Sequence, residues 1–359
     1  MCVKLLEQPG SGVKPLVEAM DKAKERIEIA IFRFNRSELE KAMIRAVGRG
    51  VFVHALIAYT NRGGEKNLRE LEMRLLASGV NVARTADDLV RYHGKYMIVD
   101  RKDLYVLGFN FTYLDMEHSR SFGLITHHEQ LVQEAVKLFD ADTKRQAYEA
   151  GSHRFIVSPV NARDELSSFI AGAKKELAIY DPKIADPRMI RLLENQAKAG
   201  VEIRIIGKLA RNAKLEARPL NKMRLHVRSI VRDRNDVFLG SQSLRAAELE
   251  TRREVGVILT DPKIAGRILK TFDEDWAAAE ESQSNQPIHA VKAARKVAKA
   301  ISKSLPPMES VLEDLVTNIA NGGDRIELDS ARLEEAVKVA VKQAVEQAVH
   351  AAVEEATEA

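Results

Sequence analysis

The chain has 359 residues, of which 45% are apolar and one is cysteine, Cys2, and its net charge is +4. This length predicts about two domains, and the apolar content is sufficient for sizeable cores. A single cysteine excludes an internal disulfide framework, no apolar run is long enough to span a bilayer, and no signal peptide precedes the first predicted element, so we expect a cytoplasmic protein.

The N-terminal part of the chain alternates between helical and strand periodicity. Apolar residues at helical spacing predict a helix over residues 12–24, and alternation predicts a strand over residues 26–32. Ser37 and Glu40 have the spacing of a capping box, which predicts the start of a second helix, and a second strand follows Gly50. We interpret these elements as scaffold and assign them no chemistry.

Residues 91–112 carry the first group of side chains suited to chemistry. His93 and Lys95 are two residues apart on a short apolar run, and because a strand has a period of two they lie on one face. Asp100 follows in a charged turn, and a second strand leads to Gly108 and Asn110. An imidazole, an ammonium group and a carboxamide at one edge of a hairpin are typical of a phosphate site. An ordinary solvated hairpin would also explain one copy of this pattern.

A second copy of the pattern begins at His226. It consists of His226, Arg228, Asp233, a charged turn, an apolar strand, and then Gly240, Ser241, Gln242 and Ser243. An ordinary hairpin edge does not explain why the same order of residue types occurs twice in one chain.

The elements that precede each motif are repeated as well. A helix, an apolar strand, a second helix and a second strand after a glycine occur in both halves, with Gly50 in the first half and Gly200 in the second. The interval from this glycine to the motif histidine is longer in the first half, because that half contains an additional helical pattern at residues 64–78. Two homologous α/β units are the simplest interpretation.

The doubled motif resembles that of the phospholipase D superfamily, in which His-x-Lys-x4-Asp is followed by a Gly/Ser-rich turn with an asparagine, once per half. The resemblance covers about residues 5–277. It implies an α/β fold of two homologous α/β/α sandwich halves related by a pseudo-twofold axis, with both motifs at one active site. We place the N-terminal half at residues 1–150, the C-terminal half at residues 151–280, and a linker with a helical tail at residues 281–359.

The sequence departs from the family pattern at three places. Arg228 stands where the family has lysine, Ser243 where it has asparagine, and Leu107-Gly108 where Gly-Ser is common. Arginine keeps the positive charge and binds phosphate in a fork, with a geometry unlike that of an ammonium group. We therefore interpret the second motif as the weaker partner.

The resemblance implies a division of roles between the histidines. We expect His93 to attack phosphorus, and His226, protonated and held by Glu254, to protonate the leaving oxygen. Glu254 follows His226 at the distance where the family often has a carboxylate that holds the imidazole, and Ser121 has the same spacing from His93. An exposed glutamate at a strand end is the alternative interpretation.

The remaining motif residues are expected to bind or to position the phosphate. The side chains expected to face its oxygens are Lys95, Arg228, Asn110, Ser243 and Gln242. We assign Asp100, Asp233, Gly108 and Gly240 to the structure of the motif. We expect neither a metal nor a cofactor, because the other histidines lack Cys or carboxylate partners at zinc spacing.

The C-terminal region differs from the body in charge. Residues 305–359 contain 4 Lys/Arg and 12 Asp/Glu, a net −8, which leaves +12 on residues 1–304. Residues 288–305 have the pattern of a basic amphipathic helix, either solvated or in peripheral contact with an anionic membrane. Residues 330–356 carry valine at every fourth position from 337 to 353, which suits docking on another helix in an oligomer; a flexible tail is the competing interpretation.

Three hypotheses follow for the function. The first is a peripheral enzyme that cuts or exchanges phosphodiesters, chiefly of phospholipids, through a phosphohistidine intermediate. The second is a nuclease of the same superfamily, favoured only by the basic body. The third is a protein that binds phosphate or mediates assembly without catalysis.

Overall fold

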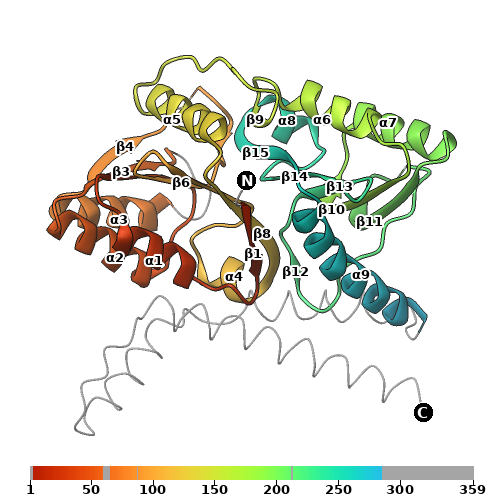
Figure 1. The fold of residues 1–359 in the computed structure, drawn as a ribbon, viewed down its shortest axis with the longest axis horizontal. Helices are drawn as coiled ribbons and strands as arrows, with labels where there is room; N and C mark the ends of the chain where they lie inside the picture. The colour runs from red at the N-terminus through yellow and green to blue at the C-terminus, as the bar shows by residue number, and fades with distance from the viewer. Residues whose placement is uncertain (1–2, 60–64, 87, 212, 285–359) are drawn as a thin grey trace, which may run out of the picture. The chain divides into compact units, whose positions relative to one another are not determined.

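The protein contains two β-sheets, each covered by helices on both faces (Figure 1). The computed structural model describes residues 3–59, 65–86, 88–211 and 213–284. Residues 1–279 form one compact unit that includes both sheets. The expected fold of two α/β/α halves is confirmed.

The first sheet belongs to the N-terminal half. Its strands have the order β1-β8-β7-β6-β2-β3-β4, parallel from β2 to β4 and antiparallel elsewhere along this path. The elements of this half are β1 (Val3–Gln8), α1 (Lys14–Lys22), β2 (Arg26–Ile31), α2 (Ser37–Gly48), β3 (Phe52–Ile57), α3 (Glu65–Ala77), β4 (Asn81–Arg84), β5 (Arg91–Tyr92), β6 (Tyr96–Val99), β7 (Asp103–Leu107), α4 (Tyr113–Glu117), β8 (Ser119–Thr126) and α5 (Glu129–Thr143).

The second sheet belongs to the C-terminal half and has the order β11-β10-β13-β14-β15-β5, with β9 also paired to β15. The elements of this half are β9 (Phe155–Ser158), α6 (Ala162–Ala171), β10 (Glu176–Ile184), α7 (Pro187–Lys198), β11 (Glu202–Leu209), β12 (Arg224–Leu225), β13 (Ser229–Arg232), β14 (Asp236–Gly240), α8 (Ala246–Glu250), β15 (Arg252–Thr260) and α9 (Pro262–Ser284).

The two halves repeat the same order of elements. The stretch of chain from β2 to β6 in the first half is longer than the stretch from β10 to β13 in the second. The difference corresponds to α3 and β4. Between β11 and β12, where all residues but 212 are described, there is no helix, and the counterpart of β4 is a single parallel bridge between Ile206 and Arg218. The additional helix expected at residues 64–78 is α3.

The halves exchange one short strand each. β5 leaves the first half and pairs in parallel with β15, so that Arg91 lies opposite Arg252. β12 leaves the second half and pairs in parallel with β8, so that Arg224 lies opposite Ser119. Because each exchanged strand ends directly before a motif histidine, the exchange delivers that histidine to the opposite half.

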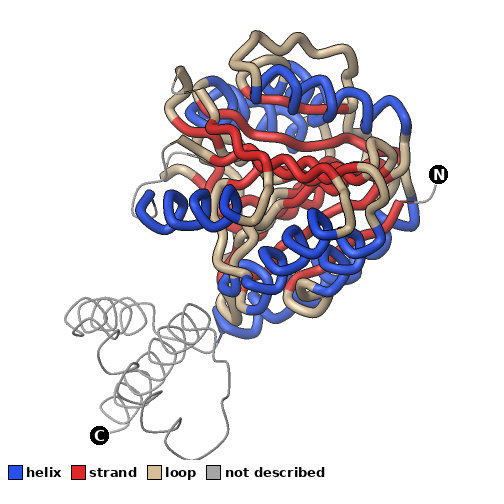
Figure 2. Tube along the Cα trace, turned by 90° about the vertical axis from the view of Figure 1, so that its left-hand side faces the viewer, coloured by secondary structure: helices blue, strands red, loops and turns tan. Residues whose placement is uncertain are grey.

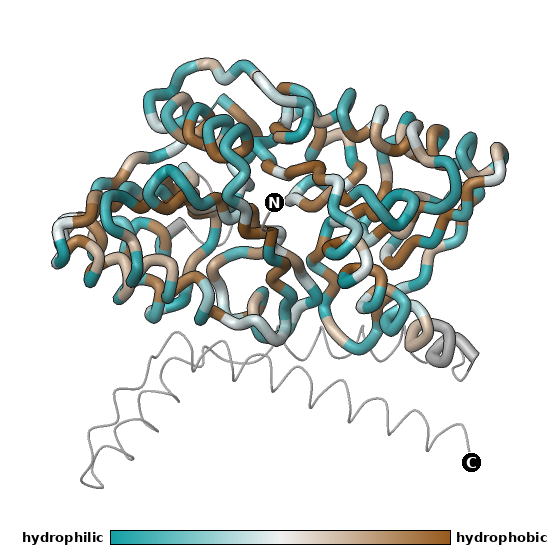
Figure 3. Tube along the Cα trace, in the orientation of Figure 1, coloured by the Kyte–Doolittle hydropathy of each residue, from teal (hydrophilic) through white to brown (hydrophobic). Residues whose placement is uncertain are grey.

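The core lies between the sheets and their helices. Figure 2 shows the strands as a central layer with helices on either side, and Figure 3 shows that apolar residues concentrate on the strands. In β2 every residue from Ile27 to Ile31 is buried, as expected for a strand covered on both faces. Glu28 is the one charged residue among these five, and its Oε1 pairs with Nη2 of Arg101 at 2.6 Å.

Two sequence-based expectations for helix ends need correction. Helix α2 begins at Ser37 as expected, but the capping box is absent, because the N-cap residue is Arg36, without a side-chain capping bond. Helix α9 continues to Ser284, so the first four residues of the expected linker are helical. The helices expected at residues 288–305 and 330–356 lie outside the described residues. No helix in the described ranges combines the length and the apolarity that a membrane span requires.

Candidate active site

Both motif histidines are anchored to the opposite half through their backbones. The N–H of His93 donates to the carbonyl oxygen of Arg253 at 2.7 Å, and the N–H of His226 donates to that of Arg120 at 3.0 Å. These bonds continue the parallel pairing of β5 with β15 and of β12 with β8. Both residues are buried, with exposed fractions of 7% for His93 and 6% for His226.

His93 is held by a carboxylate and a lysine. Its Nδ1 lies 2.7 Å from Oε2 of Glu254, which is fully buried. Nζ of Lys95 lies 2.9 Å from each ring nitrogen and donates to the carbonyl oxygen of His93 at 2.7 Å. The ring of Phe32 packs edge-on against the imidazole, at 4.6 Å between centroids. The imidazole orientation is therefore fixed from three sides.

His226 faces a different acid. Its Nδ1 lies 3.7 Å from Oδ2 of Asp115, a buried residue of the first half. The other carboxylate oxygen of Asp115 accepts a hydrogen bond from Arg224. Burial alone would raise the pKa of Asp115, but the charges of His226 and Arg224 lower it below its ordinary value. Asp115 is therefore an anion that faces His226.

The expectation that Glu254 holds His226 is wrong. Glu254 lies on β15, and β15 pairs with β5, the strand that leads into His93. Glu254, which follows the second motif, therefore contacts the histidine of the first motif. In the same way Asp115, which follows the first motif, faces the histidine of the second. The equivalent residue of the first half is Ser121, whose buried hydroxyl group has no hydrogen-bond partner among the described residues.

The two expected phosphate ligands on the motif turns, Asn110 and Ser243, are each tied to a buried acid. The backbone N–H of Asn110 donates to Asp115 at 2.8 Å, and the N–H of Ser243 donates to Glu248 at 2.8 Å. Nδ2 of Asn110 also donates to Asp115, at 2.6 Å. Both turns are therefore fixed by the acids of α4 and α8, and Asp115 joins the first turn to His226.

The cations of the two motifs take equivalent positions. Arg228 donates from Nη1 to the carbonyl oxygen of His226 at 2.7 Å, as Lys95 does to that of His93. Nε of Arg228 donates to the hydroxyl oxygen of Ser243 at 3.3 Å. The arginine thus replaces the lysine without displacing the motif.

Gln242, in contrast, is used inside its own half. Its Nε2 donates to the carbonyl oxygen of Ile156 on β9 at 3.1 Å. Successive residues of an extended chain point to opposite sides, so Gln242 points away from the side that Ser243 faces. The expectation that Gln242 faces the phosphate finds no support in this geometry.

Asp100 and Asp233 join the motif hairpins to the start of the neighbouring strands. Asp100 accepts hydrogen bonds from the backbone N–H groups of residues 24 to 26, and Asp233 accepts the equivalent bonds from residues 174 to 176. Burial opposes ionisation of both side chains, but these bonds outweigh it and lower the pKa of each carboxyl group. Both aspartates lie at hairpin turns, away from the imidazoles.

Gly108 lies where the two motif turns approach each other. A Cβ atom at this position would lie 2.8 Å from the carbonyl oxygen of Phe122 and 3.3 Å from that of Gly240. The first distance is below van der Waals contact, so any larger residue would push the strands apart.

The electrostatics connect the two motifs. Burial is the largest cause that lowers the pKa of His93, followed by the charges of Lys95 and Arg228. Burial also lowers the pKa of His226, against the charge of Asp115, and both cations add to this effect. Burial lowers the pKa of Lys95 to about 7. Because each cation acts on both imidazoles, the two motifs lie within electrostatic reach of each other.

Sequence reasoning missed three residues of this site: Asp115, Glu248 and Arg224. The spacing from His93 to Asp115 is identical to the spacing from His226 to Glu248, and Arg224 precedes His226 by two positions, as Arg91 precedes His93. These constant spacings were the available indication, because the acids and arginines otherwise look like solvated ends of short elements.

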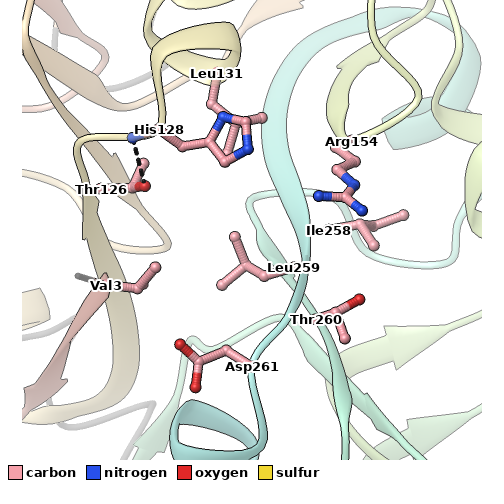
Figure 4. A pocket seen from close by; sticks show the side chains of 9 residues that line it. All are labelled: Val3, Thr126, His128, Leu131, Arg154, Ile258, Leu259, Thr260 and Asp261. Atoms are coloured by element: carbon pink, nitrogen blue, oxygen red, sulfur yellow. Dashed lines mark hydrogen bonds between the residues drawn. The ribbon is translucent and has the colours of Figure 1, made fainter. Parts of the chain in front are cut away.

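A separate pocket lies between the ends of β8 and β15 (Figure 4). His128 and Arg154 approach it from opposite sides, and Val3, Leu131 and Leu259 supply apolar wall. No motif residue lines this pocket. Within the described part of the chain, no three His, Cys, Asp or Glu side chains gather as metal ligands would.

Comparisons with known proteins agree with the repeated motif. The family model described as "Cardiolipin synthase, PLD-like domain" matches residues 16–143 and 166–276, which is more than half of the chain. The chain belongs to the phospholipase D superfamily. The two matched segments of this phospholipase D-type protein contain all the motif residues discussed above. A search of curated protein sequences found no match.

Solved structures share the phospholipase D fold at low sequence identity. Polyphosphate kinase from Porphyromonas gingivalis aligns with a TM-score of 0.65 and 18% identity over 76% of this chain, which spans only 50% of the kinase. Phosphatidylserine synthase from Haemophilus influenzae Rd KW20 aligns with a TM-score of 0.58 and 12% identity, over 77% of this chain and 85% of the synthase. The TM-scores establish a shared fold. Because the identities are this low, the substrate has to be argued from the site.

Proposed function

We propose that this protein catalyses displacement at the phosphorus of a phosphodiester through a phosphohistidine formed on His93, without a metal ion. The hydrogen bond between Nδ1 of His93 and Glu254 carries this proposal. A neutral imidazole that donates from Nδ1 to a carboxylate keeps its lone pair on Nε2, where a nucleophile needs it.

In the first step, Nε2 of His93 attacks phosphorus and the bond to the leaving oxygen breaks. Burial lowers the pKa of His93, so its imidazole is neutral and nucleophilic at neutral pH. Lys95, which lies 2.9 Å from Nε2, must turn from this nitrogen to the phosphate before the attack. The ammonium group then neutralises the charge that develops on phosphate oxygens.

His226 supplies the proton that the leaving oxygen takes up. Burial lowers its pKa in the absence of substrate, but the charge of Asp115 and the arriving phosphate anion both favour the imidazolium. In the second step, the now neutral His226 removes a proton from water or from an acceptor alcohol, which attacks the phosphohistidine and releases His93. Both histidines thus return to the protonation states that they had in the substrate complex.

The substrate that we favour is a phospholipid. The matching family model carries the name of cardiolipin synthase, and one structural relative is a phosphatidylserine synthase. A nuclease is the second candidate. Residues 1–304 carry a net charge of +12, because the whole chain has +4 and residues 305–359 have −8, and positive charge favours binding of the nucleic acid backbone. A phosphate-binding protein without turnover is the third.

The test follows the intermediate with bis(p-nitrophenyl) phosphate in the presence of a chelator. Wild-type protein should release p-nitrophenol and, after rapid denaturation, carry the aryl phosphate on His93 by mass spectrometry. The leaving group needs no acid, so His226→Ala should still label His93 but turn over slowly, whereas His93→Ala should do neither. His127→Ala, a change at an exposed histidine, serves as the control.

Labelling of His226 in place of His93, or turnover that survives in His93→Ala, would contradict the proposed mechanism. Complete absence of labelling and turnover would favour the phosphate-binding alternative. Phospholipid vesicles and single-stranded DNA, offered as competitors of the same assay, distinguish the first two substrate candidates.

A further inference from the structure

The two halves differ in charge beside their second motif acid. When His93 is aligned with His226, Thr112 of the first half corresponds to Arg245 of the second, and Ser119 corresponds to Arg252. The first half therefore carries two hydroxyl groups where the second half carries two guanidinium groups. The first half can serve as the reference for the second, because the helices and strands around these positions are equivalent in the two halves.

The arginines of the second half converge on Glu248. Oε1 of Glu248 accepts from Nη1 of Arg245 at 3.1 Å and from Nη1 of Arg252 at 3.2 Å. Oε2 lies 4.0 Å from Nε of Arg228 and accepts the backbone N–H of Ser243. We call Arg228, Arg245 and Arg252 the α8 arginine cluster, since they surround helix α8 and its acid. Three positive charges face one carboxylate.

The equivalent acid of the first half is balanced. Asp115 is bonded to a single guanidinium, that of Arg224, and its other oxygen faces His226. Two further carboxylates lie near the cluster: Glu254, which is bonded to His93, and the buried Asp181, whose pKa is raised by burial and lowered in part by the charge of Arg228. The acid of the second motif is thus surrounded by three guanidinium groups, whereas the acid of the first is bonded to one.

The cluster is accessible and close to the reacting imidazole. The side chains of Arg245 and Arg252 keep 37% and 18% of their surface exposed. Nε of Arg252 is buried and has no hydrogen-bond partner within the described ranges. After burial and the nearer cations, the charge of Arg252 contributes to lowering the pKa of His93. Arg252 also lies opposite Arg91 in the exchanged strand pair, and the guanidinium of Arg91 lies 5.5 Å from the centroid of the Phe32 ring.

We propose that the α8 arginine cluster binds a second phosphate group of the substrate, next to the phosphorus that His93 attacks. This inference rests on the proposed function and restricts its substrate to compounds with two neighbouring phosphates. Guanidinium groups recognise phosphate oxygens in pairs, and like charges held together at a partly exposed site are stabilised by a bound anion. The neighbouring phosphate of a nucleotide chain and that of a two-phosphate lipid headgroup share this chemistry.

Binding of small phosphates to the full chain tests the cluster without turnover. Titration calorimetry compares glycerol 1,3-bisphosphate with glycerol 1-phosphate, and thymidine 3′,5′-bisphosphate with thymidine 5′-phosphate. At least one bisphosphate should bind about tenfold or more tightly than its monophosphate. Arg245→Gln combined with Arg252→Gln should abolish this preference and leave monophosphate affinity within about twofold. The pair with the larger preference identifies the source of the second phosphate.

Arg163→Gln is the matched control, because Arg163 also contacts an acid of α8, Glu250, and has a similarly exposed side chain, at 17%. It should keep the preference. Thermal unfolding is compared for all three proteins. If the unfolding temperature falls further below wild type in the double variant than in Arg163→Gln, the single variant Arg245→Gln, at the more exposed position, is used in its place. Equal affinities for both members of each pair in wild type, or equal loss in the variants and the control, would overturn the inference. A bisphosphate preference without phosphohistidine would refute the proposed function and leave the cluster standing.

Discussion

Nδ1 of His93 lies 2.7 Å from Oε2 of Glu254, although the two residues belong to opposite halves of the chain. The contact exists because β5 carries His93 onto β15, where Glu254 is located. A hydrogen bond from Nδ1 to a carboxylate selects the tautomer with the lone pair on Nε2. The exchange of short strands thus gives His93 the carboxylate contact that the proposed nucleophilic attack requires.

Replacement of Glu254 should separate catalysis from binding. In Glu254→Gln the carboxamide can donate to Nδ1 as well as accept from it, so the imidazole loses its fixed tautomer and the negative charge beside it. We expect kcat with bis(p-nitrophenyl) phosphate to fall roughly 10²- to 10⁴-fold, with KM little changed. Steady-state kinetics measure both. Glu250→Gln, at an exposed acid of α8, is the control, and a change confined to KM would refute the assigned role.

The pH dependence of kcat/KM should report Lys95. Burial lowers the pKa of Lys95 to about 7 in the protein without substrate, so its positive charge is present below this pH and lost above it. We expect kcat/KM to decline as pH rises through about 7. The pKa of His93 is lowered by burial, so the decline on the acid side should begin below the ordinary histidine value of about 6.5.

Lys95→Arg provides the comparison for this profile. Arginine stays charged throughout the accessible range and already occupies the equivalent position 228. The decline above about pH 7 should disappear in this variant, even if its maximal rate is lower. Profiles between about pH 5 and about pH 9 measure the effect. An unchanged alkaline decline in Lys95→Arg would assign it to another group.

The repeated motif allowed the architecture and most of the site to be predicted from the sequence. The recurrence of the motif and of the elements before it identified two halves, and periodicity located the hairpins that carry His93 and His226. The partner of each histidine was not predictable in this way. β5 and β12 contain two residues each and have no strand pattern of their own, so nothing in the sequence showed that they leave their half.

Asp115 and Glu248 illustrate a second limit. Each is an acid on a five-residue helix, where an isolated sequence suggests a solvated side chain. The structure buries both because each accepts the backbone N–H of the motif turn. Only their identical spacing from the two histidines distinguishes them, and this regularity gains meaning once the turns are seen to be equivalent.

Asp115 should matter for the departure of a poor leaving group. In Asp115→Asn the imidazolium of His226 loses its facing anion, so proton donation weakens. We expect turnover of an alkyl phosphodiester to fall roughly 10²-fold, with a much smaller effect on the first release of p-nitrophenolate, which leaves without a proton. A merely structural role would reduce both rates alike. Glu117→Gln, at an acid of α4 that pairs with Arg36, is the control.

Ser121 offers a rescue of this variant. It occupies the position equivalent to Glu254, and its buried hydroxyl group has no partner in the described part of the chain. Ser121→Glu in the Asp115→Asn background should restore part of the alkyl diester turnover, because the new carboxylate would approach His226 as Glu254 approaches His93. Thermal unfolding checks that the double variant is folded. A folded double variant without any recovery would contradict the equivalence of the two positions.

Asp100 and Asp233 should control stability and its pH dependence. Three backbone N–H groups donate to each carboxylate, and the turn residues Asp100 and Asp233 both have φ of 51°, a conformation that asparagine also tolerates. Asp100→Asn therefore removes the charge and one acceptor without straining the turn. We expect it to lower the free energy of unfolding by about 1–3 kcal/mol at neutral pH.

The same variant tests the sign of the pKa shift. Although burial opposes it, the net effect of the backbone bonds lowers the pKa of Asp100 in the folded protein. Its stabilisation is thus complete above the ordinary carboxyl pKa and is lost as pH falls through the lowered folded value. In urea titrations, the difference between wild type and Asp100→Asn should shrink toward zero under acid conditions. Asp103→Asn, at a residue of the same hairpin, is the control, and a difference that grows on acidification would show that Asp100 is not stabilised as an anion.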